Sequence, residues 1–178
     1  MSAPRPAGAG RPPRGSRKVA KPHFLESGLV LADYEPRFAA ELLPMWRASF
    51  EHGVGIIDPH TLAEQHAFFA NDVLPDNAVK VALRDQTLCG FVAATSESIN
   101  QLYVRVGHGG QGIGTCLLDW AKAQSSGSLW LYTFAQNTIA RRFYERHGFT
   151  VVAQGYEPMW KLADIKYRWQ RSPDARRP

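Results

Sequence analysis

Two short motifs constrain this chain most: the glycine-rich stretch GHGGQGIG at residues 107–114, and NTIARRFYERHGF at residues 137–149. A glycine-rich turn that opens a helix offers free backbone N–H groups to an anionic phosphate. In the second motif Asn137, Ala140 and Tyr144 share one helix face, because spacings of three, four and seven residues are close to whole turns. The pair predicts one element that binds a phosphorylated ligand and another that directs a phenol toward it.

The hydrophobic pattern predicts a mixed α/β domain. Alternation with a period of two over residues 78–105 predicts an antiparallel meander whose first turn lies at residues 85–87. The expected strands are 29–32, 78–84, 88–95, 98–105, 128–134, 149–153 and 163–169, and the expected helices begin near residues 36, 61, 113 and 138. This order predicts a mixed, predominantly antiparallel sheet flanked by helices.

Two helices have apolar faces that can be predicted from spacing. The second helix begins either at residues 58–59 or at a capping box formed by Thr61 and Glu64. In the last helix Ile139 and Phe143, four residues apart, are expected to point into the core. The inward face of the second helix is expected to carry Leu62, His66, Phe69 and Val73.

Positive charge is concentrated at the N-terminus. Residues 1–22 carry a charge of +6 and the whole chain +5, so residues 23–178 carry −1. A basic segment rich in Pro and Gly is typical of a disordered tail rather than of a nucleic-acid site. We therefore expect a disordered tail at 1–22, one folded domain at 23–170, a flexible tail at 171–178 and no nucleic-acid partner.

Other motifs are lacking, and their lack excludes several classes of protein. Cys89 and Cys116 form no CxxC motif, and the six histidines form no HExxH motif, so no metal site is expected. No apolar run approaches the length of a membrane helix, and residues 1–22 lack the apolar segment of a secretory signal. We expect a cytoplasmic protein without membrane association.

The glycine-rich loop also fits two other nucleotide-binding patterns in part. Gly107, Gly109 and Gly112 have the dinucleotide-binding spacing, but the loop follows an antiparallel meander, and Ser-Gly-Ser at 126–128 stands where a ribose-binding acid is required. A Walker A motif is excluded because Thr-Cys, not Lys-Ser/Thr, follows Gly114.

Residues 99–149, with LYV before the glycine-rich loop and N-x-x-A-x-x-F-Y-E-x-x-G-F after it, resemble the GNAT superfamily of N-acetyltransferases. The resemblance implies a GNAT-like acyl-CoA N-acyltransferase fold with acetyl-CoA as co-substrate. It assigns cofactor binding to Leu102, Tyr103, Val104, Gly110, Gln111, Gly112, Ile113, Gly114, Thr115, Asn137, Ala140 and Tyr144.

The resemblance also implies individual roles. Tyr144 is the general acid, since a phenol with a pKa of about 10 can protonate a departing thiolate whose conjugate acid has a pKa of about 8.5. Asn137 can cap its helix and hydrogen-bond the pantetheine arm. The amides of residues 111–115 hold the pyrophosphate, and the amide of Val104 or a neighbour stabilises the tetrahedral oxyanion.

The chain departs from the family pattern in two respects. Gly109 stands where the family has Gln or Arg, so a polar group over the pyrophosphate is missing and the loop costs more to order. Ser98 and Asn100 occupy the strand positions where many members have a carboxylate as general base. The candidates for that role are Glu97, Glu51, His52 and an ordered water. Arg141 and Arg142 flank the site, either as contacts to CoA phosphates or as solvated surface.

These roles predict transfer of an acetyl group from acetyl-CoA to a primary amine of a small molecule or amino acid by direct attack. Cys116 is not expected to act as a nucleophile because it lies inside the helix after the loop. Acetylation of a protein N-terminus or lysine and a non-catalytic acyl-CoA-binding regulatory module are the alternatives, and a homodimer is left open. The acceptor pocket is expected to be walled by residues 50–57 and by Tyr156, Trp160, Tyr167 and Trp169.

Overall fold

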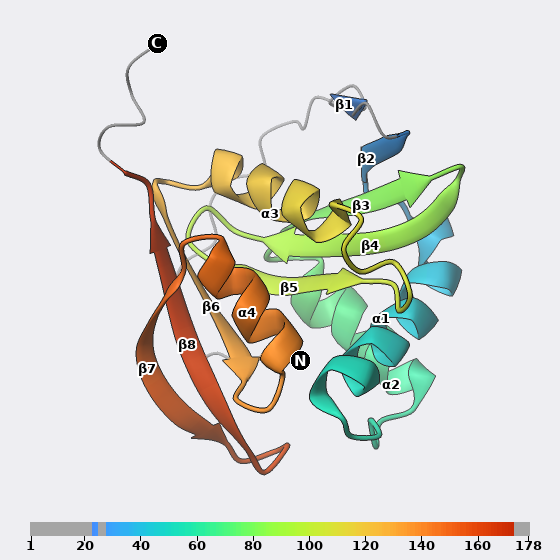
Figure 1. The fold of residues 1–178 in the computed structure, drawn as a ribbon. Helices are drawn as coiled ribbons and strands as arrows, with labels where there is room; N and C mark the ends of the chain where they lie inside the picture. Colours follow the sequence, from blue (N-terminus) through green and yellow to red (C-terminus); the bar gives the residue numbers. More distant parts are fainter. Residues whose placement is uncertain (1–22, 25–27, 173–178) are drawn as a thin grey trace.

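The computed structural model describes residues 23–24 and 28–172 and shows two antiparallel sheets that diverge from one another (Figure 1). The mixed α/β architecture expected from the sequence is confirmed. The predicted tail at residues 1–22 lies outside the described residues, as does the predicted C-terminal tail beyond residue 172.

The first sheet is a meander in which each strand pairs antiparallel with the next. Its strands are β1 (His23–Phe24), β2 (Leu29–Asp33), β3 (Ala78–Arg84), β4 (Thr87–Ala94) and β5 (Ile99–Val104). Asp85 and Gln86 join β3 to β4 with φ angles of 49° and 65°, as a two-residue type I′ turn requires. The meander predicted from alternation is therefore confirmed.

The second sheet has the order β6 (Ser128–Phe134), β8 (Leu162–Gln170), β7 (Thr150–Glu157). One parallel bridge, between Ser98 and Trp130, connects it to β5, and Trp130 N donates to the Glu97 carbonyl oxygen over 3.0 Å. Beyond this bridge β5 pairs with β4 and β6 pairs with β8 throughout the described part of the chain. The sheets therefore diverge and leave an opening between β5 and β6 (Figure 1).

Helices cover both faces of the first sheet. The turn η1 (Pro36–Phe38) leads into α1 (Ala39–Val54), and α2 (Leu62–Phe68) continues into the π-turn η2 (Phe69–Val73); α3 (Ile113–Gln124) follows the glycine-rich loop, and α4 (Thr138–Arg146) follows β6. Because neighbouring strand residues point to opposite faces, β4 contributes to two cores. Val92 lies in one hydrophobic core together with Leu117 of α3. Phe91 lies in the other core together with Trp46 of α1.

The second helix buries only part of the predicted inward face: Phe69 and Val73 are buried as expected, whereas Leu62 and His66 are exposed. The capping box is confirmed, since Thr61 Oγ1 accepts from Glu64 N and the Glu64 carboxylate accepts from Thr61 N. However, Leu62 is 49% exposed and Gln65 is buried in its place. The aromatic core fixes Phe69, and Gln65 lies four residues before it, on the same face.

The inward face of α4 was predicted correctly at Phe143, which packs against the core, but not at Ile139. Ile139 is 62% exposed, whereas Tyr144 is buried with 6% exposure. The Tyr144 ring packs edge-on against Phe149 and near Tyr167 of β8, with centroids 5.5 and 6.3 Å away. A short helix that lies on a sheet buries the face that contacts the strands, so Ile139 is left at the surface.

Candidate active site

A cleft of about 850 Å³ opens between β5, the start of α3 and α4. Every residue predicted to bind the cofactor lines it except Gln111. The Gln111 side chain is hydrogen-bonded to the Arg84 guanidinium on β3, so this residue can offer the cleft only its backbone. The lining residues are Leu102, Tyr103, Val104, Gly110, Gly112, Ile113, Gly114, Thr115, Asn137, Ala140 and Tyr144 among others.

The start of α3 presents free backbone amides at this cleft. Gly112 is the N-cap in the left-handed region, with φ 79°, and as a glycine it has no side chain that could cap the helix. The first hydrogen bond of the helix runs from Cys116 N to the Gly112 carbonyl oxygen over 2.9 Å. The N–H groups of residues 113–115 precede this bond, so they are available to an anion at the positive end of the helix.

Helices α3 and α4 approach each other closely beside the loop. A Cβ on Gly114 would lie 3.2 Å from the Phe143 ring, so this glycine is required for packing as well as for any phosphate contact. His147 Nε2 lies 3.1 Å from Thr115 Oγ1, which links the end of α4 to the start of α3. Gly109 differs, because its φ is outside the left-handed region and its Cβ position is open.

Asn137 is the N-cap of α4, as predicted. Its Oδ1 accepts from Ala140 N over 3.0 Å, so the amide oxygen caps the helix. A Cβ on Gly53 of α1 would lie 3.0 Å from Asn137 Nδ2, which shows that α1 and the start of α4 are in close contact. The capping bond fixes the direction of the Asn137 side chain at the cleft.

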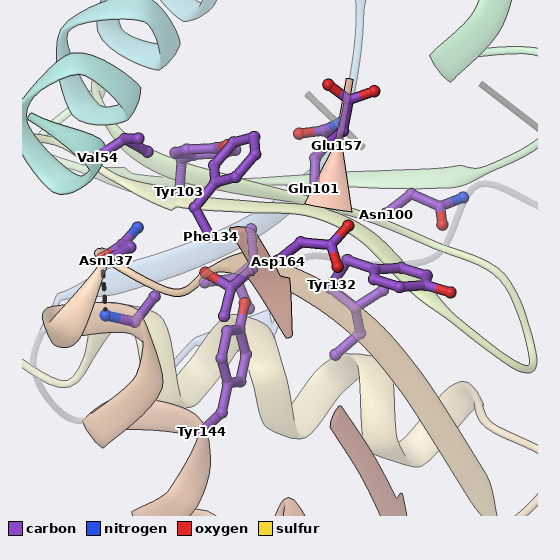
Figure 2. A pocket seen from close by; sticks show the side chains of 14 residues that line it. Val54, Asn100, Gln101, Tyr103, Tyr132, Phe134, Asn137, Tyr144, Glu157 and Asp164 are labelled. Carbon is purple, nitrogen blue, oxygen red and sulfur yellow. Dashed lines mark hydrogen bonds between the residues drawn. The ribbon is translucent and has the colours of Figure 1, made fainter. Parts of the chain in front are cut away.

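A second, smaller cavity of about 80 Å³ lies in the opening between β5 and β6. It shares five lining residues with the cleft, so the two spaces meet, and Figure 2 shows the Tyr144 hydroxyl directed into the cavity. The shared residues are Leu102, Tyr103, Asn137, Ala140 and Tyr144.

Burial controls the ionisation of both phenols at this junction. Desolvation raises the pKa of Tyr144 above its ordinary value of about 10, and the nearby Tyr103 acts in the same direction. Burial likewise raises the pKa of Tyr103 to about 12. Both phenols therefore stay protonated at neutral pH, so that Tyr144 can donate a proton but cannot act as a base.

The backbone of β5 offers donors at the same place. Arg105 N donates to the Cys89 carbonyl oxygen over 2.8 Å, and N–H directions alternate along a strand. The N–H groups of Leu102 and Val104 therefore point to the free edge of β5, toward the opening. The Ser49 hydroxyl lies 2.9 Å from the Val104 carbonyl oxygen at this edge.

The predicted aromatic wall of the acceptor pocket is only partly correct. Trp160 packs against Phe50 of α1, with ring centroids 4.9 Å apart. Tyr167 and Trp169 lie on the opposite face of β8, against α4 and Phe149, because residues at intervals of two share a strand face. Tyr156 is exposed. Phe50 and Trp160 line neither space, but both pack against Phe134, which lines the small cavity. The aromatic wall is therefore Phe134 backed by these two rings, and residues 52–54 are the part of the predicted segment that lines the two spaces.

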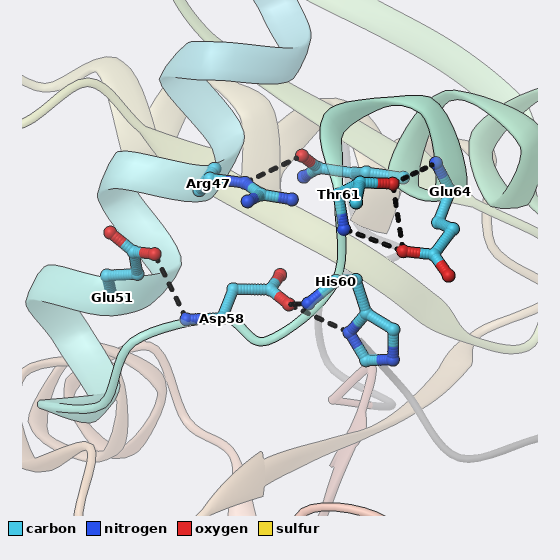
Figure 3. A network of polar contacts seen from close by, with 7 residues as sticks. Arg47, Glu51, Asp58, His60, Thr61 and Glu64 are labelled. Carbon is cyan, nitrogen blue, oxygen red and sulfur yellow. Dashed lines mark hydrogen bonds and ion pairs between the residues drawn. The ribbon is translucent and has the colours of Figure 1, made fainter.

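A polar network holds the segment between α1 and α2 in place (Figure 3). Asp58 is only 6% exposed. Its carboxylate accepts a hydrogen bond from His60 N over 2.9 Å and contacts His60 Nδ1 at 2.8 Å. Asp58 N in turn donates to Glu51 Oε1 over 3.0 Å. The His60 ring packs edge-on against Trp160 at 5.3 Å, so the network positions the aromatic wall.

None of the three side chains predicted as general base lines the small cavity. Glu97 is exposed in the turn before β5, and Glu51 is bound to Asp58. His52 is exposed and lines the large cleft. The carboxylates that do line the cavity are Glu157 of β7 and Asp164 of β8.

Sequence reasoning missed these two carboxylates. Asp164 belongs to the polar half of an alternating strand, a pattern that ordinarily indicates solvent. Glu157 lies beyond the predicted end of the strand at 149–153, because β7 continues in register with β8 to the Glu157–Leu162 pair. The sequence feature that could have indicated them is the presence of acidic residues close to the turn between the last two strands.

The arginines at the cleft also differ from those predicted. Arg141 Nη1 donates to the Ala135 carbonyl oxygen over 3.1 Å, so its guanidinium is directed away from the cleft. Arg105 and Arg146 line the cleft instead, and Arg105 Nη2 is paired with the Glu41 carboxylate at 2.5 Å. Arg146 is the exposed cation at the rim, three residues after Phe143 on the same helix face.

Comparison with known proteins identifies the family. The acetyltransferase (GNAT) domain matches residues 75–151. The peptidyl-lysine N-acetyltransferase YjaB of Salmonella typhimurium is 31% identical over 115 residues, which are 64% of this chain and 78% of that protein. This chain belongs to the GNAT superfamily. It is therefore an N-acetyltransferase with acetyl-CoA as its co-substrate.

Solved structures share the fold. Apo YjaB from Escherichia coli superposes with a TM-score of 0.67 at 18% identity, covering 81% of this chain and 99% of that one. The PaiA N-acetyltransferase of Thermoplasma acidophilum, solved in complex with coenzyme A, has a TM-score of 0.65 at 18% identity, covering 80% and 98%. Within the described residues of this acetyltransferase, no helix is long and apolar enough to cross a membrane, and no three His, Cys, Asp or Glu residues form a group that could hold a metal ion.

Proposed function

We propose that this acetyltransferase transfers the acetyl group of acetyl-CoA directly to a primary amine, with Tyr144 as general acid. One observation carries the proposal: the protonated Tyr144 phenol lies where the large cleft and the small cavity meet. A group at that junction can reach both a thioester that enters from the cleft and an acceptor that enters from the cavity. No covalent enzyme intermediate is required.

The fit of acetyl-CoA is supported by the donors along the cleft, whose volume of about 850 Å³ is within the range of ligand pockets. The amides of residues 113–115 would hold the pyrophosphate. Asn137 Nδ2 would bind the pantetheine arm, because Oδ1 is already used in the cap. The outward N–H of Val104 would stabilise the oxyanion that forms at the thioester carbonyl.

Tyr144 would act when the carbon–sulfur bond breaks. The departing thiolate has a conjugate acid with a pKa of about 8.5, well below the raised pKa of the phenol, so the proton is transferred in concert with bond cleavage rather than in advance. Cys116 is not suited to attack the thioester: it lies in α3, and burial raises the pKa of its thiol.

For the acceptor, a small-molecule amine or amino acid and a protein lysine are the two candidates. The lysine candidate is favoured by the 31% identical relative named as a peptidyl-lysine N-acetyltransferase. The narrowness of the small cavity is compatible with either, since both present an amine at the end of a chain.

A thiol-release assay tests the proposal. The full-length protein is incubated with acetyl-CoA and a panel of free amines, amino acids and lysine-containing peptides, and acetylated products are identified by mass spectrometry. We expect amine-dependent thiol release with at least one class. Binding of acetyl-CoA in calorimetry without any amine-dependent turnover would instead indicate a non-catalytic acyl-CoA-binding module.

A further inference from the structure

The small cavity between β5 and β6 has an acidic wall. Asp164 of β8 and Glu157 of β7 both line it, and they are diagonal neighbours on one face of the sheet, since Gly155 pairs with Asp164 and Glu157 pairs with Leu162. The other titratable groups that line the cavity are the phenols of Tyr103, Tyr132 and Tyr144. No Lys, Arg or His lines it.

The two carboxylates are held differently. Glu157 is buried, and its Oε2 accepts from Trp160 N over 2.7 Å, which fixes its position at the turn into β8. The Asp164 carboxylate has no hydrogen bond or ion pair with the described part of the chain. The nearest cation along β8, Lys166, lies over the rings of Trp130 and Tyr132, at 4.9 and 5.3 Å. Asp164 is therefore the carboxylate that is left to meet a ligand.

The strand opposite leaves room for this carboxylate. A Cβ on Gly155 would lie 2.6 Å from Asp164 Oδ1, a distance at which one of the two must move. Only glycine at position 155 permits the observed place of the carboxylate. Figure 2 shows the Asp164 carboxylate in the same cavity as the Tyr144 hydroxyl.

We propose that Asp164 removes the proton from the acceptor ammonium, and that the acidic wall selects the cationic end of an unbranched alkylamine. The inference rests on the proposed acetyl transfer and names its acceptor class. The cavity, at about 80 Å³, is far smaller than the cleft, which favours a slender aminoalkyl end over a branched or cyclic group. The lysine side chain and free alkylamines share this chemistry.

The proton balance is complete without another reactant. The ammonium gives one proton to the Asp164 carboxylate, and the neutral nitrogen forms a bond to the thioester carbon. The carbon–sulfur bond then breaks and Tyr144 protonates the thiolate. The nitrogen, which carries two protons after the attack, gives one to the phenolate and keeps the other as the N–H of the amide product. Asp164 returns its proton to solvent. Burial, and then the charge of Glu157, raise the pKa of the Asp164 carboxyl, which makes it a stronger base than an exposed aspartate.

The test compares Asp164→Asn with the wild type in the thiol-release assay, using n-butylamine and an N-terminally blocked lysine peptide as acceptors. At pH 7 we expect kcat to fall roughly 100-fold or more with either acceptor, as for a lost general base. The deficit should shrink as the pH rises toward the acceptor's own pKa of about 10.4, where the amine needs no base. The ratio of the wild-type kcat/KM values for the two acceptors distinguishes a protein lysine from a free amine as the preferred substrate.

The pH profile supplies a readout that a structural role would not change. In the wild type kcat/KM should fall as the pH decreases through the raised pKa of Asp164. Glu157→Gln removes the charge that raises this pKa, so the acidic limb should move to lower pH. Asp119→Asn, an exposed carboxylate on α3 outside both cavities, is the matched control and should leave the profile unchanged.

Gly155→Ala is a second variant, which displaces the Asp164 carboxylate without a change of charge. It should also lower kcat. Calorimetry with acetyl-CoA reports whether each variant is folded. An Asp164→Asn protein that binds acetyl-CoA and keeps the wild-type kcat and pH profile would overturn the assignment of the base. Equal activity with a branched amine would overturn the selection. A wild type inactive with every amine would instead overturn the proposed function.

Discussion

Tyr144, the proposed general acid, is a phenol that burial keeps protonated. The ring is in the core against Phe149 and Tyr167, while its hydroxyl reaches the junction of the cleft and the cavity. Because desolvation raises the pKa, ionisation of this phenol should not limit kcat anywhere below pH 10. In the proposed reaction one side chain thus serves both the packing and the chemistry.

Tyr144→Phe separates these two roles. The variant keeps the ring and loses the proton, so we expect kcat to fall roughly 100-fold or more, with little change in the affinity for acetyl-CoA or in thermal stability. Stopped assays give kcat, and calorimetry gives the affinity. Wild-type turnover in this variant would show that the hydroxyl is a packing feature only.

Gly109 can be changed without backbone strain. Arg at this position would place a guanidinium at the loop that is proposed to hold the pyrophosphate, where charge-assisted contacts to phosphate become available. It would also remove a flexible glycine from a loop that must be ordered. Since φ is outside the left-handed region and the Cβ position is open, we expect Gly109→Arg to tighten acetyl-CoA binding by about 1 kcal/mol, or fivefold.

Calorimetry measures this change, and Gly109→Ala is the control that alters the backbone entropy alone. Weaker binding in a folded Gly109→Arg protein would mean that the phosphates do not pass over this residue. Substitutions at Gly114 are less informative, since a side chain there would press on Phe143 and disturb the packing of α3 on α4.

Among the elements, the segment between α1 and α2 is held by one buried carboxylate. We expect Asp58→Ala to release His60 and with it Trp160, so that KM for the acceptor rises several-fold while the affinity for acetyl-CoA is unchanged. The lost hydrogen bonds to a charged acceptor should also lower the free energy of unfolding by about 1–3 kcal/mol.

A matched variant in the same segment tests this point. Thr61→Ala removes the capping box of α2 at a cost of about 1 kcal/mol but leaves the Asp58 contacts intact. Urea unfolding gives both stabilities, and acceptor titration gives both KM values. A rise in KM of equal size in the two variants would mean that general loosening, not the Asp58 network, controls the wall.

Elements could be predicted from the sequence where local chemistry determines them. The hairpin at Asp85 and Gln86 and the caps at Thr61 and Asn137 depend on residues within a few positions, and the structure has them as expected. The inward faces at Gln65 and Tyr144 depend on which strand or aromatic cluster each helix meets. Periodicity alone carries no information about that partner, so Leu62, His66 and Ile139 were wrongly placed in the core.

For the molecule as a whole, the fold and the cofactor side of the site followed from motifs, and the acceptor side did not. The predicted cofactor-binding residues come from motifs that lie near one another in sequence or at adjacent element ends, and all of them but Gln111 line one cleft. Asp164 and Glu157 reach the site only because β8 lies between β6 and β7. That strand order brings polar residues to the opening from the far end of the chain, and spacing does not reveal it.

Among the residues that the structure describes, the divergence of the two sheets leaves the facing edges of β5 and β6 without a strand partner past the Ser98–Trp130 bridge. The co-substrate has an extended arm that carries amide groups. Such an arm can lie in this gap and accept hydrogen bonds from the N–H groups of Leu102 and Val104. The co-substrate would then act as a temporary strand, and amide hydrogen exchange is the direct measure of it. We expect amide exchange at residues 102 and 104 to slow on addition of CoA. Exchange of the amides that pair β3 with β4 should slow only by the amount that the gain in global stability explains. Uniform protection without a local excess at these two positions would contradict this view of the enzyme as a sheet completed by its own substrate.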